Sequence, residues 1–319
     1  MKRRLLVAGL AALLALAGCS SGGAPTPAPS FAAPRPAGVQ DPAVIPSTSA
    51  GPAANCNPVA SLRPHGTLPS PGNMPASMAT IVSHGRLVVG VDQNTFLFGF
   101  RNATSGEIEG FDIDIARQVA AAIFGTADGH IQLVAITSAQ RIPFVSSGQV
   151  DLVADTMTMN CARWQQVNFS SQYYEAGQRV LVPKNSTVTG IDTLAGKKVC
   201  AAAGSTSIAN IAAAKSKPVP VSVNDWTDCL VLLQQGQVDA ISTDDTILAG
   251  LAAQDPTVKL VGPPFTSEPY GMAIAKNATD FTRFVNGVLA NIRANGQWSA
   301  IYQRWLGGTA TPPAAQYQD

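Results

Sequence analysis

Short apolar runs alternate with segments of helical periodicity through the body of the chain. The runs at 87–91, 130–136 and 150–156 have the length of buried strands and are rich in valine, leucine and isoleucine. Residues 110–125 and 225–237 instead carry apolar side chains three and four positions apart, as amphipathic helices do. Strands that alternate with helices predict a mainly parallel sheet of the α/β class.

An internal repeat adds to this picture. SGQVDLVADT at 147–156 is similar to QGQVDAISTD at 235–244, and each runs from a helix through Gly-Gln-Val-Asp into a strand that ends in polar residues. The similarity fits a duplicated unit and a common helix-to-strand turn equally well. It supports two similar α/β lobes in either case. Because ligands bind at the carboxyl ends of strands in open α/β sheets, two such ends that face each other would form a cleft.

The two ends of the chain have a different composition from its body. Residues 1–18 have a basic start and an apolar run too short for a membrane span, which predicts a secretory signal. Leu-Ala-Gly-Cys at 16–19 is similar to a bacterial lipobox, in which Cys19 is lipidated; the alternative is an ordinary signal peptide with a chance cysteine. Residues 19–75, rich in Pro, Ala, Gly and Ser, predict a tether, and the tail 309–319 is expected to be loose. We therefore expect an extracytoplasmic protein on the outer face of the cell membrane, held by a lipid anchor.

Composition and cysteines narrow the classes of protein. The 319-residue chain is 46% hydrophobic and has a net charge of +1, which supports a packed core and gives no reason to expect a nucleic-acid partner. Besides Cys19, four cysteines remain, which in an oxidising compartment allow two disulfides in three connectivities. We favour Cys200–Cys229, because both lie in one predicted βαβ stretch, and this leaves Cys56–Cys161. The cysteines and histidines lack the spacing of a metal site, so we expect no metal and no cofactor.

Candidate chemistry lies where the predicted strands end. In DTMTMNCARW (155–164), Thr156 and Thr158 alternate on one strand, and Arg163 follows in a turn or short helix. A guanidinium group matches a carboxylate in two parallel hydrogen bonds, although a surface arginine would give the same pattern.

The second half of the chain adds an anion site and an acid. Ser205 and Thr206 begin a helix whose free N–H groups suit an anion, or they simply cap it. Asp244 ends the second strand of the repeat, where its carboxylate could hold an ammonium group or cap the next helix. An anion clamp facing a cation acceptor predicts a zwitterion, an amino acid, as ligand. Arg101 and Arg141 are further positive charges near predicted strand ends that could bind a side-chain carboxylate.

Six motifs in the same order carry a resemblance to a known family: LVVGVDQ, GFDIDIARQVA, RIPFVSSGQVDLVADTMTMNCARWQQVNFSSQYY, GKKVCAAAGSTS, GQVDAISTDDTILAG and PYGMAI. Over roughly 78–307 the chain resembles extracytoplasmic solute-binding proteins of the polar amino-acid class, and most of all glutamate/glutamine-binding lipoproteins of ABC-type importers. The resemblance implies a two-lobed periplasmic-binding-protein-like fold of type II, with the ligand in the cleft between the lobes. Lobe 1 would comprise 76–180 plus 268–310, and lobe 2 would comprise 181–267.

The resemblance also implies which residues hold the ligand's α-carboxylate. Arg163 would bind it, with Thr158 beside it. Ser205 and Thr206 would close on the same group from the second lobe.

Other positions would hold the rest of the ligand. Asp244 would take the α-ammonium group, aided by Thr156. The resemblance places Arg141 and Ser138 where acidic-amino-acid binders hold the side-chain carboxylate, although Arg141 could equally lie on a helix surface. Phe96 falls where such proteins place an aromatic wall, and core packing would explain it as well.

Asp155 departs from the pattern that the resemblance suggests. If it faced the cleft, its charge would repel an acidic side chain and favour an amide. Alternation along a strand places it opposite Thr156, facing another element. Glutamate versus glutamine, and aspartate versus asparagine, therefore stay open.

The function expected from these features is binding and delivery. We expect a monomer that closes on one polar amino acid and presents it to the membrane subunits of an ABC importer. An amino-acid sensor that signals through a membrane partner is the alternative. A dehydratase on the same scaffold is a weaker alternative, because no His or Cys nucleophile pair is apparent. We therefore expect the protein not to be an enzyme. A structural lipoprotein with a vestigial site is the third.

Overall fold

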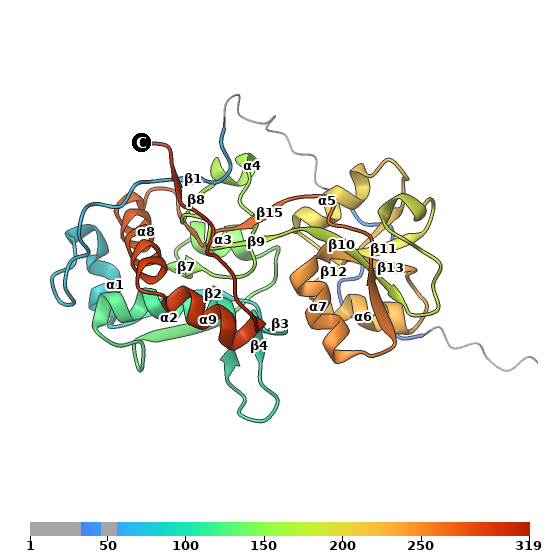
Figure 1. Ribbon diagram of the computed structural model, residues 1–319, viewed down its shortest axis with the longest axis horizontal. Coiled ribbons are helices and arrows are strands. Elements are labelled where there is room, and N and C mark those ends of the chain that lie inside the picture. Colours follow the sequence, from blue (N-terminus) through green and yellow to red (C-terminus); the bar gives the residue numbers. More distant parts are fainter. Residues whose placement is uncertain (1–32, 46–55) are drawn as a thin grey trace, which may run out of the picture. The chain divides into compact units, whose positions relative to one another are not determined.

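The computed structural model describes residues 33–45 and 56–319. The predicted signal segment 1–18 and the predicted lipidation site Cys19 lie outside the described residues. Within the described part, no helix is both long enough and apolar enough to span a membrane. Residues 35–319 form one compact unit that holds two five-stranded sheets (Figure 1). The fold is therefore α/β, as the alternation of strands and helices predicts.

The first sheet has the strand order β6-β2-β7-β16-β8. Strand β2 pairs in parallel with β6 and β7, and β16 runs antiparallel to β7 and β8. Helices α2, α8 and α9 contribute to one large apolar core with β2 (Figure 1). The elements of this first lobe are α1 (Ala79–His84), β2 (Leu87–Val91), α2 (Phe111–Phe124), β6 (Ile131–Ala135), α3 (Arg141–Ser146), β7 (Leu152–Val153), α4 (Cys161–Trp164), β8 (Val167–Phe169), β16 (Ala273–Ala275), α8 (Thr279–Ala294) and α9 (Gln297–Leu306).

The second sheet repeats this plan with the order β12-β11-β13-β10-β14. Strand β11 pairs in parallel with β12 and β13, and β10 runs antiparallel to β13 and β14. Apolar clusters cover both faces, so the central strand β13 is buried throughout and its neighbours β11 and β10 are largely buried. The elements of this second lobe are β10 (Gln178–Pro183), β11 (Lys198–Ala202), α5 (Thr206–Ala213), β12 (Val219–Val223), α6 (Trp226–Gln234), β13 (Ala240–Asp244), α7 (Asp245–Gln254) and β14 (Val258–Val261).

Two short strands lie where the chain passes between the lobes. Strands β9 (Tyr174–Ala176) and β15 (Glu268–Tyr270) pair antiparallel, and they lead into β10 and β16 (Figure 1). A separate ribbon of β3 (Asn94–Thr95), β4 (Gly99–Arg101) and β5 (Ile108–Glu109) precedes α2. A two-stranded hinge of this kind lets two lobes rotate as bodies around few residues.

The described parts of the predicted tether contact the folded body, contrary to the expectation of a free linker. Gln40 forms an antiparallel bridge with Ser222 of β12, and Asp41 accepts hydrogen bonds from Arg35 and Lys198. The backbone groups of an edge strand such as β12 are unpaired on one side, and a proline-rich segment can use them at its non-proline positions.

The C-terminal tail is also ordered rather than loose. Strand β1 (Ala60–Ser61) pairs in parallel with β17 (Gln316–Tyr317). Asp319 accepts a hydrogen bond from the backbone N–H of Arg63 and pairs with Arg283 of α8. The tail and the segment after Cys56 therefore stabilise each other on the first lobe.

Both predicted disulfides are present. Cys200–Cys229 joins β11 to α6 inside the second lobe, with the two Cα atoms 5.6 Å apart. Cys56–Cys161 joins the N-terminal segment to α4, with a Cα separation of 5.9 Å. The first is part of an apolar core, and the second lies beside the cleft described next.

Candidate functional site

A groove of about 620 Å³ lies between the carboxyl ends of the two sheets. Residues from α3 and α4 line one side, and the start of α5 lines the other. The predicted residues Ser138, Arg163, Ser205 and Thr206 all line it, together with Ile45 from the N-terminal segment. The sequence-predicted anion site is therefore formed by both lobes.

Arg163 is buried in this groove without an acidic partner. It is 8% exposed, and its guanidinium donates to the backbone carbonyl of Thr158 at 2.7 Å and, across the groove, to that of Gly204 at 3.1 Å. Burial and the nearby charge of Arg141 together lower the pKa of Arg163 to about 9, and nearby acids such as Glu268 and Asp244 partly offset this. Carbonyl oxygens orient the guanidinium but leave its charge uncompensated, which suits it to bind an anion.

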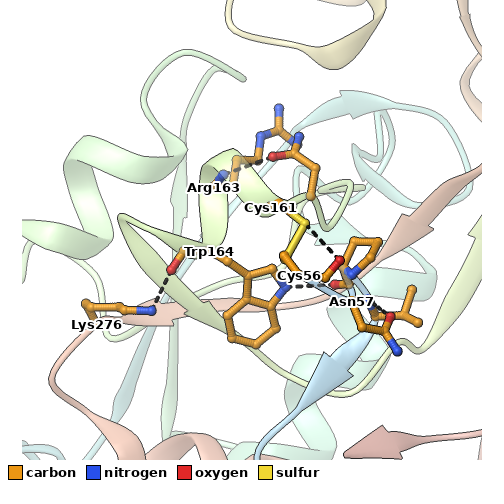
Figure 2. The surroundings of a disulfide bond; sticks show 9 residues. Cys56, Asn57, Cys161, Arg163, Trp164 and Lys276 are labelled. Atoms are coloured by element: carbon orange, nitrogen blue, oxygen red, sulfur yellow. Dashed lines mark hydrogen bonds between the residues drawn. A yellow bond between two sulfur atoms is a disulfide. The ribbon is translucent and has the colours of Figure 1, made fainter. Parts of the chain in front are cut away.

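The short helix α4 holds Arg163 in place. Asn160 caps it by accepting a hydrogen bond from the backbone N–H of Arg163. Its first residue is tied to Cys56 by the disulfide, and the indole of Trp164 donates to the carbonyl of Pro58 (Figure 2). A four-residue helix has little stability of its own, so these contacts fix the position of the guanidinium.

Arg141 is a second buried cation of the same kind. It begins α3, is 3% exposed, and donates to the carbonyls of Ser138 at 3.0 Å and Asp155 at 2.9 Å. Neither it nor Arg163 forms an ion pair with an acidic side chain of the described residues. Its Nη2 atom makes no hydrogen bond to these residues either. Arg163 in the groove and Arg141 close to it therefore form a pair of fixed positive charges.

Asp244 supplies the opposite charge from the end of β13. It is 3% exposed, and one carboxylate oxygen accepts a hydrogen bond from the Tyr270 hydroxyl at 2.6 Å. The other oxygen, Oδ1, is buried and has no partner among the described residues. Burial and, to a lesser extent, the nearby charge of Glu268 raise the pKa of Asp244 to about 8. A cation placed at Oδ1 would offset the cost of burying this carboxylate.

Glu268 is a site residue that sequence reasoning missed. It comes from hinge strand β15, is 2% exposed, and accepts hydrogen bonds from Thr158 at 2.6 Å, Thr206 at 2.8 Å and Thr266 at 2.7 Å. Asn210 of α5 donates a fourth at 3.1 Å. An acid just before the apolar run YGMAIA was the available signal, because a buried strand seldom contains an unpaired carboxylate.

The backbone at Thr156 changes the interpretation of Asp155. Strand β7 ends at Val153, and Thr156 has a φ of 39°, a left-handed conformation that is unusual for a β-branched residue. Its N–H meets the Asp112 carboxylate at 2.7 Å. Strand alternation therefore does not fix the side chain of Asp155. That side chain is 1% exposed, and neither of its oxygens has a partner in the part of the chain that the structure describes. Burial raises its pKa well above the usual value, and Arg141 partly offsets this.

Two other predicted residues lie apart from the charged cluster. Phe96 follows β3, and its backbone carbonyl would lie 2.9 Å from a Cβ atom at Gly250 of α7, so it marks a close approach of the two lobes. Arg101 is exposed in β4 and donates to Gln93 and to a carbonyl of its own hairpin. The structure does not bring Arg101 to the cleft. Among the described residues, no group of three or more His, Cys, Asp or Glu side chains is placed to hold a metal ion.

The arrangement suits a ligand with two negative groups or one negative and one polar group, and one cation between them.

The chain matches the family model of bacterial extracellular solute-binding proteins, family 3, over residues 87–308. Among curated relatives, the ABC transporter glutamine-binding protein GlnH of Bacillus subtilis is 38% identical over 72% of this chain and 84% of the relative. The glutamate-binding protein GluB of Corynebacterium efficiens is 31% identical over 71% and 80%.

Solved structures show the same fold. An ancestral arginine-binding protein bound to glutamine is 31% identical, with a TM-score of 0.66 over 70% of this chain and 99% of that structure. The solute receptor for L-cysteine of Neisseria gonorrhoeae is 27% identical, with a TM-score of 0.69 over 72% and 94%. Relatives of one fold thus bind amino acids with very different side chains, and the residues in the cleft must set the choice.

Proposed function

The chain belongs to family 3 of the bacterial extracellular solute-binding proteins, and from this premise we propose that it is a receptor for one polar amino acid, glutamate, glutamine, aspartate or asparagine. It closes its two lobes on the ligand and delivers it to the membrane subunits of an ABC importer; the name of one relative, an ABC transporter glutamine-binding protein, supports the importer role. A lipid on Cys19, outside the described residues, would hold it on the outer face of the membrane.

One observation carries this proposal: among the described residues, the buried Arg163 of the groove and the nearby buried Arg141 have no acidic ion-pair partner, and the buried carboxylate of Asp244, close to Arg163, has an oxygen without a partner. Arg163 is the candidate for the α-carboxylate, since it is held by carbonyls of both lobes and a ligand there would bridge them. Asp244 is the candidate for the α-ammonium group through its Oδ1 atom. Each group would exchange water for one charged partner, which is the condition for a favourable buried ion pair.

Arg141 supports an acidic side chain as the first choice among the four ligands. Its Nη2 atom is available, and the two carbonyls that hold it carry no net charge. Asp155 does not cancel this charge while its carboxyl is protonated, which burial favours. We therefore expect glutamate and aspartate to bind more tightly than glutamine and asparagine.

Isothermal titration of the mature chain with the four amino acids tests this function. A ligand at one hundred times its dissociation constant should also stabilise the protein by about 2.7 kcal/mol in a thermal scan. Saturable binding of at least one of the four is the expected result. No heat and no thermal shift with any of them would refute the proposed function.

Two variants separate the two guanidinium groups. Arg163→Met should abolish binding of all four amino acids, because each carries an α-carboxylate. Arg141→Met should weaken glutamate by about 10-fold or more and leave glutamine within about 3-fold. Arg101→Met is the matched control, because its side chain bonds within an exposed hairpin. Equal losses for both ligands in Arg141→Met would contradict the preference for an acid.

A further inference from the structure

Glu268 and two threonines form a junction between the lobes that no motif predicted. Thr158 belongs to the first lobe and Thr206 begins α5 in the second, and both hydroxyls donate to the same oxygen of Glu268. We propose that Glu268 is a positioning residue that makes these hydroxyls hydrogen-bond acceptors toward the cleft, so that they receive the ligand's α-ammonium group. The proposal rests on the proposed function and assigns a different role from the one implied by the resemblance, which placed both threonines at the α-carboxylate.

Each of the two threonine hydroxyls can donate its proton either to Glu268 or to a ligand, but not to both. Each threonine hydroxyl has one proton to donate and two lone pairs to accept with. The contacts to Glu268 are 2.6 Å from Thr158 and 2.8 Å from Thr206, whereas the two hydroxyls are 3.4 Å from each other. A carboxylate can only accept, so the two short contacts take both protons. Only lone pairs then remain for a ligand.

The side-chain amides of Gln178 and Asn210 fix the Glu268 carboxylate as a hydrogen-bond acceptor. Gln178 is fully buried, and its amide nitrogen donates to the carbonyl of Ser207 and to the hydroxyl of Ser242. Because a backbone carbonyl can only accept, this orients the Gln178 oxygen toward Asn210, whose amide nitrogen donates to it at 2.8 Å. The same Asn210 nitrogen donates to Oε1 of Glu268. The position of Oε1 must therefore be occupied by an acceptor.

A second residue of hinge strand β15, Tyr270, indicates where the ammonium site lies. Tyr270 lies two positions after Glu268 and thus on the same face of β15. Its hydroxyl donates a hydrogen bond to Oδ2 of Asp244, and Oδ1 has no partner among the described residues. The charge of Glu268 acts on Asp244, so the two carboxylates lie near each other. We therefore place the ammonium group among three acceptors, the hydroxyls of Thr158 and Thr206 and this Oδ1, the number that an ammonium group can satisfy. The α-carboxylate is then left to Arg163.

Glu268→Gln tests the proposal because Asn210 forces the orientation of the new amide. Its oxygen must face Asn210, so its nitrogen faces the two threonines and frees their protons to point into the cleft. Binding of glutamate should weaken by about 10- to 100-fold, the effect of losing hydrogen bonds to a charged group. Binding of glutarate, which has both carboxylates and no ammonium group, should stay within about 3-fold or become tighter. Titration and competition against bound glutamate measure the two ligands.

Controls separate this role from a merely structural one. Glu175→Gln changes the same residue type on the partner hinge strand, where the carboxylate accepts from Ser267 and Gln172 rather than from the two threonines, and should leave both affinities unchanged. The double variant Glu268→Gln with Asn210→Ala lets the amide turn over, so part of the glutamate affinity should return. If Glu268→Gln does not fold, Thr158→Val should show the same split between glutamate and glutarate.

The outcomes distinguish the two levels of inference. An equal loss for glutamate and glutarate, or no loss for glutamate, would overturn the role of Glu268 while the proposed function stands. Failure of the double variant to recover glutamate binding would also overturn it, since the amide chain would then not set the orientation. A wild-type protein that binds none of the four amino acids would overturn both.

Discussion

Strands β7 and β13 start from nearly the same sequence and end differently. Both follow a helix and a glycine, and the aspartate of each Gly-Gln-Val-Asp turn performs the same task. Asp151 accepts a hydrogen bond from the backbone N–H of Val88 at 2.8 Å, and Asp239 accepts one from Lys198 at 2.9 Å. Each thereby fixes the register of its strand against the parallel neighbour, β2 or β11.

The difference appears in the last two residues. The repeat ends in Asp155–Thr156, two residues after β7, and in Thr243–Asp244 at the end of β13, so acid and hydroxyl are exchanged. Thr156 has a left-handed φ of 39°, whereas Asp244 keeps an ordinary φ of −59°. Regular backbone allows β13 to deliver its acid to the cleft, while the turn in the first lobe directs a backbone N–H to Asp112. Similar sequences thus place a carboxylate, Asp244, at the end of β13 and a left-handed residue, Thr156, after β7.

Exchanging each acid for its amide should produce the largest contrast between the strands. Asp244→Asn should weaken glutamate binding by about 100-fold or more, because the ammonium group loses its buried counter-charge. Asp155→Asn should change it by less than about 5-fold, since burial already favours the neutral form of that carboxyl. Isothermal titration of both variants measures the difference. Equal losses would show that the two strand ends contribute alike.

The pH dependence of binding should follow Asp244. Its pKa of about 8 lies above the usual value, so the unliganded protein gains stability from the protonated form below about pH 4 and loses it as the pH rises toward 8. The ligand needs the ionised form, so affinity should fall as the pH drops below 8, by up to about tenfold per unit. Titrations at pH 6, 7 and 8 in buffers of different ionisation enthalpy would detect the released proton. In Asp244→Asn the remaining binding should lack this dependence.

The shared part of the repeat should respond equally in both lobes. Asp151→Ala and Asp239→Ala each leave a strand N–H without its acceptor and should lower the free energy of unfolding by about 1 to 2 kcal/mol. Urea denaturation of each variant measures this value. A loss confined to one strand would indicate that the repeat is similar in sequence only.

Removing the side chain at Thr156 should give the smallest effect. Thr156→Gly relieves a strained backbone but increases the freedom of the unfolded chain, so stability should rise by less than about 1 kcal/mol. Thr243→Gly, in regular strand, should lower it by about 1 kcal/mol or more, because the hydrogen bond of that threonine to Ser207 is also lost. The same sign for both would mean that the φ of Thr156 carries no strain.

The sequence was sufficient where local patterns decide the outcome. Apolar periodicity predicted the α/β class, and the motifs identified the family that the comparison confirmed. Both disulfides followed from cysteine positions and are present. Arg163, Ser205 and Thr206 lie together in the groove, because strand ends and helix starts converge in such sheets.

What the sequence did not predict depends on distant segments or on single dihedral angles. Glu268 reaches Thr158 from 110 residues away, so no local pattern relates them. The docking of residues 35–45 requires the free edge of β12, which exists only after the second sheet has formed. The direction of the Asp155 side chain stays a prediction, because the left-handed φ of Thr156 takes the backbone out of regular strand geometry there.

The disulfide beside the cleft helps to hold the helix that carries Arg163. Helix α4 is too short to persist alone, and Cys161 holds it to the N-terminal segment. That bond forms in an oxidising compartment and not in the reducing cytoplasm. The position of the Arg163 guanidinium therefore depends in part on a covalent bond that a reducing environment would not maintain.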